Sequence, residues 1–347
     1  MMNLLRRALL CLTLAAAFAV PANSQNLDIV SVGAVSAASD AAFMIADRKG
    51  FFRDEGINVK FITFNSANDM IAPLGTGQLD AGGGGVSAGL YNAFGRGVQI
   101  KIVADRSTDT PGYGYNVFVV RKDLVTSGRY KTIADLRGLK FAEPSKGNPS
   151  LPLIERILAK GGLKYDDVDH VYLSYPDQLI ALQNGGIDAT CLLEPWATQA
   201  VKLGVATRIA GDDAFYPNQQ IAVLLYGDSF IQKRPDVAKR FMVAYLRAVR
   251  YYAGALKDGH ISGRNSAEVI GFLSDTLKVK DASIFRDMTA SGINPTGRVN
   301  LKSLENDYGI FKQHGLLTSD VSVAKAVDTT FIDYANSVLG PYKPGAR

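Results

Sequence analysis

Four consecutive glycines followed by a serine are the part of the sequence best suited to hold a ligand. The glycines at residues 82–85 allow backbone conformations that a Cβ prevents, and they leave room for close approach to the main chain. Residues 86–88 then start a run with helical spacing that continues to Phe94, so Ser87 lies near a helix N-terminus, where free amide groups and the positive end of the dipole favour an anion. We therefore predict that Gly84, Gly85 and Ser87 contact a ligand; a plain strand-to-helix turn is the alternative.

Arg106 is the candidate for pairing with a charged ligand. It follows an expected strand over residues 99–104, so its side chain would emerge where strand ends border a cleft. A guanidinium can hold a planar anion through two parallel hydrogen bonds. The alternatives are a solvated loop arginine or an ion pair with Asp105 or Asp109.

A loop of small residues before the expected helix at 41–50 supplies hydroxyl donors. Ser36 and Ser39 are candidate ligand contacts there. Asp40 is better suited to capping the helix, because a side-chain oxygen at this position accepts from free backbone amides.

Three later loops add polar and aromatic candidates. Asn148 and Ser150 precede a helix over residues 151–160, where capping and ligand contact are equally open. Tyr175 and Trp196 follow later strands, where rings can form an apolar wall or a stacking face. Packing of Trp196 within its own lobe is the alternative. Four residues beside the expected hinge strands are weaker candidates: Tyr113, Tyr115, Tyr216 and Asn218.

Strands and helices alternate along most of the chain. Strands are expected at residues 27–33, 57–61, 80–85, 99–104, 139–142, 168–173 and 186–193. This rhythm predicts parallel, doubly wound α/β sheets, whose ligands bind at the carboxyl ends of strands. The rhythm is broken by two long extended segments, at 113–120 and 219–226, and the chain beyond Asp228 is mainly helical.

The two halves of this region repeat each other. Gly77-Gln-Leu-Asp80-Ala81 corresponds to Gly185-Gly-Ile-Asp188-Ala189, each at a turn from helix into strand. We predict an α/β fold in which the two long extended segments join two lobes. The ligand would lie in the cleft between them, and a hinge would close the lobes around it.

The N-terminus has the pattern of a secretory signal peptide over residues 1–24. Arg6 and Arg7 precede a short apolar run, and small residues follow at a cleavage position before Gln25. The sequence thus predicts a soluble, exported protein. It also predicts no lipid anchor, because Cys11 lies inside the apolar run. After cleavage Cys191 alone remains, which excludes an intramolecular disulfide and suggests a buried structural thiol.

Charge and composition exclude several functions. The formal net charge is +5, and no cluster of Lys and Arg with interleaved aromatic residues occurs, so nucleic-acid binding is not expected. The three histidines (His170, His260 and His314) are scattered without metal-ligand spacing. We expect neither a metal nor a cofactor, and no Ser-His-Asp set can be placed.

Several motifs in order resemble the periplasmic solute-binding proteins of ABC importers, in the alkanesulfonate, taurine, nitrate and thiamin-pyrimidine group. They are Ala46-Asp-Arg-Lys-Gly-Phe-Phe-Arg-Asp-Glu-Gly-Ile57, Gly77-Gln-Leu-Asp-Ala81, Asn116-Val-Phe-Val-Val-Arg-Lys-Asp123, Ile133-Ala-Asp-Leu-Arg-Gly138, Gly186-Ile-Asp-Ala189 and Glu194-Pro-Trp196. The match covers most of the chain from about Asn26 to Gly271.

The resemblance implies a type II binding-protein fold in which the first and last segments of the chain share one lobe, so that residues 25–115 plus 227–347 form the first lobe and residues 116–226 form the second. It also implies a monomer in the periplasm and delivery of a small ligand to an ABC permease in the inner membrane. In that group the ligand is held by loops that correspond here to residues 36–40, 83–87 and 146–150. A small organic anion, a sulfonate or carboxylate with or without an aromatic ring, is the expected ligand. A neutral thiamin pyrimidine precursor is the second hypothesis.

Other functions of the same fold fit less well. The thiamin-pyrimidine synthases carry a cysteine-rich signature that is missing here. The aromatic desulfinases use a nucleophilic cysteine, whereas Cys191 lies in the middle of an expected strand with no nearby histidine. We therefore do not expect an enzyme, and a sensor role stays open.

Overall fold

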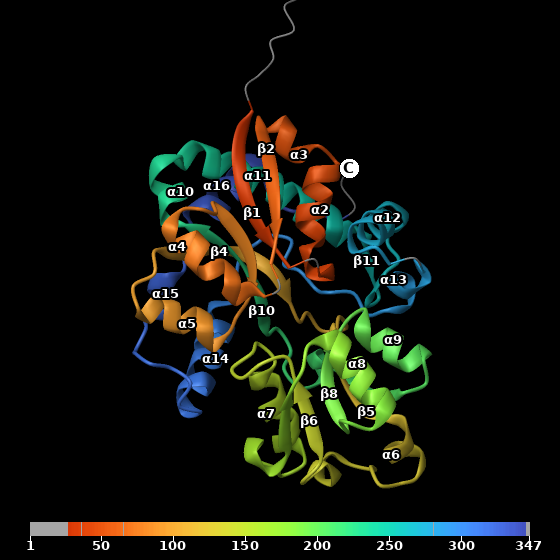
Figure 1. The fold of residues 1–347 in the computed structure, drawn as a ribbon. Helices are drawn as coiled ribbons and strands as arrows, with labels where there is room; N and C mark the ends of the chain where they lie inside the picture. Colours follow the sequence, from red (N-terminus) through yellow and green to blue (C-terminus); the bar gives the residue numbers. More distant parts are fainter. Residues whose placement is uncertain (1–26, 36, 65, 280, 345–347) are drawn as a thin grey trace, which may run out of the picture.

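The computed structural model describes residues 27–344 except residues 36, 65 and 280. The predicted signal peptide and Ser36 lie outside the described residues. The described chain forms two α/β lobes, each built on its own five-stranded sheet (Figure 1). The predicted two-lobe α/β architecture is confirmed, although both sheets are mixed rather than purely parallel.

The sheet of the first lobe combines distant parts of the chain. Its order is β2 (Ile57–Thr63), β1 (Asp28–Ala34), β3 (Ala81–Gly85), β10 (Gln220–Gly227) and β4 (Ile100–Thr108). β1 is parallel to β2 and β3, whereas β10 runs antiparallel to β3 and β4. The structure thus places β10 inside the first sheet, whereas the sequence-based division assigned residues up to 226 to the second lobe. Every residue of β10 is buried, as expected for a strand covered on both faces.

The sheet of the second lobe has the order β7 (Asp169–Tyr172), β6 (Lys140–Glu143), β8 (Ala189–Leu193), β5 (Asn116–Arg121) and β9 (Ala206–Gly211). β6 is parallel to β7 and β8, and β5 is antiparallel to β8 and β9. The edge strand β9 was not expected from sequence. Its residues after Ala206 are only half-buried, so its apolar pattern is weak.

Helices cover both sheets and dominate the C-terminal third. The N-terminal helices are α2 (Ala41–Arg48), α3 (Phe51–Asp54), α4 (Ile71–Thr76) and α5 (Ala88–Gly95). The second lobe carries α6 (Lys122–Thr126), α7 (Leu151–Lys160), α8 (Tyr175–Asn184) and α9 (Trp196–Lys202). The C-terminal third contains α10 (Asp228–Lys233), α11 (Pro235–Ala255), β11 (Leu256–Lys257), β12 (His260–Ile261), α12 (Ser266–Leu277), α13 (Ser283–Asp287), α14 (Leu301–Gln313), α15 (Val323–Ala326) and α16 (Thr330–Leu339).

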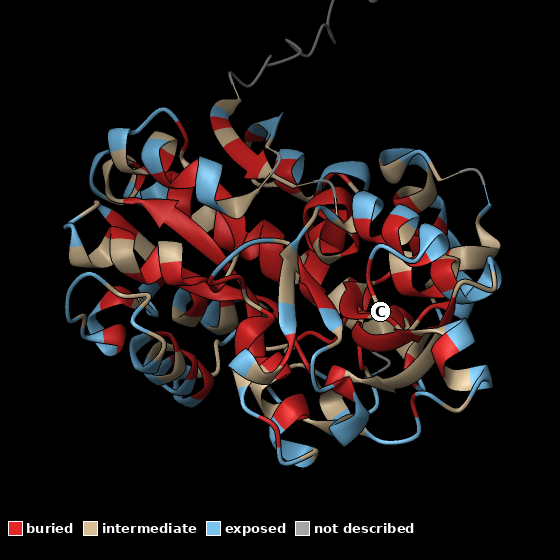
Figure 2. Cartoon of the chain, turned by 60° about the horizontal axis from the view of Figure 1, so that its bottom comes forward, coloured by how far each residue is buried: buried red, intermediate tan, exposed pale blue. Residues whose placement is uncertain are grey.

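Buried residues concentrate in the strands and in the helix faces that lie against them (Figure 2). The long helix α11 supplies much of the core of the first lobe. Its apolar residues at helical spacing are all buried: Val237, Phe241, Tyr245, Leu246, Val249 and Tyr252. The charged residues Arg247 and Arg250 lie off this face, at an intermediate exposure.

The internal repeat has a structural explanation. Gly77 and Gly185 both end helices with φ of +76°, a conformation that glycine adopts at no steric cost. Three residues later, Asp80 accepts a hydrogen bond from the amide of Ser31 at 2.8 Å, and Asp188 accepts one from the amide of Lys140 at 2.9 Å. Each aspartate also pairs with an arginine, Arg234 or Arg121. The repeated motif therefore anchors neighbouring strands and is not a ligand site.

Candidate functional site

The two lobes meet where the glycine-rich segment faces the loop before α7. The amide of Ala88, at the first position of α5, donates to the carbonyl oxygen of Gly147 in the second lobe at 3.0 Å. A Cβ placed on Gly85 would lie 2.6 Å from Cγ of Pro149. Two of the three predicted ligand loops are therefore in direct contact, and an oxygen atom already occupies the positive end of the helix.

The glycine-rich segment is a regular strand rather than an open loop. Gly82 to Gly85 pair with β10, and the amide of Val86 continues the pairing by donating to Ile221. Glycine is needed here because of close neighbours: a Cβ on Gly83 would lie 2.4 Å from Nε of Arg106. Gly85 thus borders the junction of the lobes, whereas a Cβ on Gly84 would meet Ala67 and Leu225 of the first lobe. The backbone groups of both glycines support the sheet.

Ser87 begins α5 as its N-cap, in the position that the sequence predicts. Its hydroxyl oxygen accepts from the amide of Leu90 at 3.3 Å and donates to Oδ1 of Asn68 at 3.0 Å. The side chain is buried. Capping and contact between loops are therefore its roles in this conformation, and the ligand contact stays a prediction.

Arg106 is buried beneath the glycine-rich strand and pairs with Asp40. Its Nε donates to Oδ1 of Asp40 at 3.1 Å, and a second nitrogen of the guanidinium bonds the same oxygen. The other carboxylate oxygen of Asp40 accepts from the amides of Val35 and Ala37. Asp40 therefore ties down the loop before α2 instead of capping that helix with its side chain. The positive charge of Arg106 is already neutralised within the protein.

Asn148 and Ser150 are buried in a hydrogen-bonded loop of the second lobe. Asn148 donates to Oε2 of Glu143 at 2.6 Å and to the carbonyl of Ser145 at 2.7 Å, and its own oxygen accepts from the amide of Ser150. The hydroxyl of Ser150 accepts from Asn116 at 2.8 Å. Glu143 also binds Tyr165 and His170. This network fixes the loop that contacts α5.

Two tyrosines, Tyr115 and Tyr175, have hydroxyl groups beside other predicted contact residues. Tyr115, just before β5, is 1% exposed, and its hydroxyl has no hydrogen-bond partner among the described residues. Burial raises the pKa of Tyr115 and of Tyr175, so both hydroxyls stay protonated and can donate. Ser39 lies beside the hydroxyl of Tyr115, and Ser150 beside that of Tyr175. The structure thus brings these four predicted residues into two neighbouring pairs.

Trp196 starts α9 and is partly buried against the apolar core of the second lobe. The preceding Glu194 is almost fully buried and follows β8. Its carboxylate accepts from the amide and hydroxyl of Thr198 and pairs with Arg208. The amide of Thr289, in the segment after α13, also approaches it at 3.4 Å. Glu194 therefore joins the second lobe to the C-terminal third of the chain.

Some residues of this junction were missed or underrated by sequence reasoning. Tyr115 was only a weak candidate, Gly147 was named only as part of the predicted ligand loop 146–150, and Glu143 and Glu194 were given no role of their own. The sequence does contain a pattern that could have identified Glu143 and Glu194. Glu143 is the last residue of an apolar strand and Glu194 directly follows one, and an unpaired carboxylate buried there is costly. Their partners, however, come from distant segments and could not be read from local sequence.

In the part of the chain that the structure describes, no group of three or more His, Cys, Asp or Glu side chains could hold a metal ion. In the same residues, no helix has the length and apolar character that a membrane span requires.

Comparison with known proteins gives the family. A family model described as NMT1-like matches residues 24–267, more than two thirds of the chain. The chain belongs to the NMT1-like family of periplasmic solute-binding proteins. One curated relative, a putative aliphatic sulfonates-binding protein of Escherichia coli, is 29% identical over 146 residues, which cover 42% of this chain and 43% of that protein. The chain thus matches less than half the length of this relative.

Solved structures share the fold of this NMT1-like protein. The periplasmic aliphatic sulphonate-binding protein SsuA from Escherichia coli superposes with a TM-score of 0.70 at 20% identity, covering 87% of this chain and 92% of that one. The desulfurization enzyme DSZB superposes with a TM-score of 0.62 at 15% identity, covering 90% of this chain and all of that one. The fold therefore occurs in both a binding protein and an enzyme.

Cys191 of this NMT1-like protein lies in a setting that disfavours nucleophilic chemistry. Cys191 is 1% exposed in the middle of β8 and forms no disulfide. Burial raises the pKa of its thiol well above the usual value, and the charges of Asp212 and Glu143 act in the same direction. A buried neutral thiol is a poor nucleophile.

Proposed function

We propose that this protein captures a small organic anion, a sulfonate or a carboxylate with or without an aromatic ring, between its lobes in the periplasm. It would then deliver the ligand as a monomer to an ABC permease in the inner membrane. Family membership and the two-lobe fold support the binding and transport role. The acid–base surroundings of Cys191 argue against a desulfinase activity.

The observation that carries the anion proposal is the contact between Ala88 and Gly147. A carbonyl oxygen of the second lobe sits on the first amide of α5, at the positive end of the helix dipole. An oxygen of a sulfonate or carboxylate would take the same position if the lobes opened and the Gly147 carbonyl withdrew. The hydroxyl groups of Ser39 and Tyr115, which lie beside each other, offer further donors.

One observation favours the second candidate, a neutral thiamin pyrimidine precursor. Arg106 is the only cation among the predicted contacts, and Asp40 already neutralises it. The buried carboxylates of Glu143 and Glu194 lie on the facing lobe. A neutral ring that stacks on tyrosine would need no unpaired cation.

Ser87→Asp separates the two candidates. Aspartate also caps helices, so α5 should keep its start, while the new charge should repel an anion. We expect affinity for an alkanesulfonate or aromatic carboxylate to fall at least about tenfold in calorimetric titration, and affinity for an aminopyrimidine to change less than about twofold.

The control is Thr132→Asp, which adds the same charge at the exposed N-cap of another helical turn. It should leave both affinities unchanged. The probe ligand comes first from native mass spectrometry of the exported protein, with fragmentation of any released molecule. If Ser87→Asp left anion affinity intact, the anionic group would have to bind elsewhere.

A further inference from the structure

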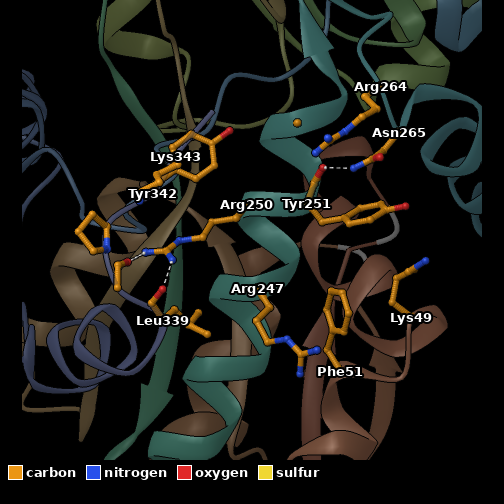
Figure 3. Close-up of a pocket in the computed structure, with 13 residues that line it drawn as sticks. Lys49, Phe51, Arg247, Arg250, Tyr251, Arg264, Asn265, Leu339, Tyr342 and Lys343 are labelled. Carbon is orange, nitrogen blue, oxygen red and sulfur yellow. Dashed lines mark hydrogen bonds between the residues drawn. The ribbon is translucent and has the colours of Figure 1, made fainter. Parts of the chain in front are cut away.

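A hollow lies on the first lobe, beside the long helix α11 (Figure 3). Its volume is about 950 Å³, within the range of small-molecule sites. Its walls come from the end of α2, the start of α3, one side of α11, the turn before α12 and the chain after α16. None of the residues predicted to bind the transported ligand belongs to it.

The lining is strongly cationic. It contains five basic side chains and no carboxylate: Lys49, Arg247, Arg250, Arg264 and Lys343. Lys49 binds Glu268 at 2.9 Å and Arg247 binds Asp54 at 3.1 Å, and neither acidic residue belongs to the lining. The charges of Lys49 and Arg247 are thus balanced from outside the hollow.

Arg250 carries a charge that the described residues do not neutralise. Its guanidinium donates to the carbonyl oxygens of Pro295, Leu339 and Gly340 and to Oδ1 of Asn336, all of them neutral acceptors. Burial lowers the pKa of Arg250, as expected for a cation without an adjacent carboxylate. The side chain is thus held rigidly, and an anion could supply the missing charge.

Aromatic rings and one glycine shape the same hollow. Phe51, Tyr251 and Tyr342 line it, with the Arg247 guanidinium 4.3 Å from the centroid of Phe51. Arg247, Tyr251 and Gly254 recur on one side of α11 at helical spacing. Gly254 has no steric need to be glycine, because its nearest neighbour to a new Cβ would be Asn265 at 3.5 Å. The missing side chain leaves room in the hollow.

We propose that this hollow is a second binding site, for an aromatic molecule that carries two or more phosphate, sulfonate or carboxylate groups. Arg250 and the neighbouring basic residues bind the anionic groups, and the rings of Phe51 and Tyr251 contact the aromatic part. The site works independently of the ligand held between the lobes.

Three probes distinguish the contribution of the anionic groups from that of the aromatic ring. They are adenosine triphosphate, inorganic tripolyphosphate and adenosine, each without added divalent metal. Titration calorimetry on the full mature protein should show the triphosphate binding at least about tenfold more tightly than either partial probe. Added salt should weaken the binding of adenosine triphosphate, because part of the affinity is electrostatic.

Two variants with different chemistry test the location. Arg250→Gln removes the uncompensated charge, and Gly254→Leu fills the space while keeping every charge and favouring the helix. Each should weaken binding of adenosine triphosphate at least about tenfold. The control is Arg96→Gln, which removes an exposed charge elsewhere on the first lobe and should change the affinity less than about twofold.

Thermal unfolding of each variant confirms that the fold is kept, and Gly254→Leu keeps the test valid if Arg250→Gln unfolds. The proposal is overturned if tripolyphosphate binds as tightly as adenosine triphosphate, if Gly254→Leu has no effect, or if Arg96→Gln weakens binding equally. Absence of binding at about 1 mM probe would overturn it as well.

Discussion

Arg106 shows how burial changes the meaning of a charged residue. Its position beside a strand end predicts an exposed guanidinium at the cleft, but the structure encloses it below Gly83 and pairs it with Asp40. The sequence-based alternatives named only Asp105 and Asp109, its near neighbours. Asp40 precedes Arg106 by 66 residues, so local sequence could not reveal the pair.

Asp40→Ala should therefore destabilise the protein strongly. It leaves the guanidinium buried without a counter-charge and frees the amides of Val35 and Ala37, which together cost about 3–5 kcal/mol. Chemical denaturation measures the free energy of unfolding. The matched control is Asp320→Ala, which breaks an exposed pair with Lys312 and should cost less than about 1 kcal/mol. Equal losses of unfolding free energy in the two variants would show that the buried ion pair stabilises the protein no more than the exposed one.

At the scale of elements, β3 combines two reasons for glycine that the sequence could not separate. Gly83 has Arg106 of its own lobe as its close neighbour, whereas Gly85 has Pro149 of the opposite lobe. The run of four glycines predicted a ligand cradle or a turn. The structure shows a paired strand whose missing side chains admit a guanidinium on one side and a loop of the second lobe on the other.

Two alanine substitutions in β3 should thus have different effects. In Gly85→Ala the new methyl group meets a rigid proline ring at 2.6 Å, which disfavours the closed arrangement but not the lobe itself. We expect a larger radius of gyration in X-ray scattering and little change in melting temperature. Gly83→Ala should instead lower the melting temperature, because Arg106 must move within a packed lobe. If Gly85→Ala behaved like Gly83→Ala, the contact with Pro149 would not control closure.

At the scale of the whole molecule, local patterns predict most elements but not how they are distributed between lobes. The order of strands and helices, the ends at Gly77 and Gly185, and the buried face of α11 all follow from spacing and residue type. The insertion of β10 between β3 and β4 does not, because it is an antiparallel pairing between segments more than 100 residues apart. The contacts of the junction depend on how far the lobes close, which no local pattern encodes.

The two segments that cross between the lobes are joined by a pair of buried acids. Asp109 lies on the first crossing and Asp212 on the second, and the backbone of Asp109 bonds both Asn218 and Gln219. Burial and the charge of Asp212 raise the pKa of Asp109 well above its usual value. Burial also raises the pKa of Asp212 to about 7 and that of Asp307, beside Tyr216, to about 7.

These raised pKa values predict that the folded state is favoured by mild acid. The folded protein binds these protons more tightly than the unfolded chain, in which aspartate has its usual pKa of 3.8. The stabilisation is complete below that value and is lost as the pH rises towards 7, by up to about 1.4 kcal/mol per pH unit for each group. We expect the melting temperature to fall between about pH 5 and pH 8. Asp212→Asn should flatten this dependence, because an amide of similar shape does not titrate, whereas Asp275→Asn at an exposed position should leave it unchanged. A melting temperature that rose across this range would mean that the carboxyl groups of Asp109, Asp212 and Asp307 are ionised in the folded protein without loss of stability.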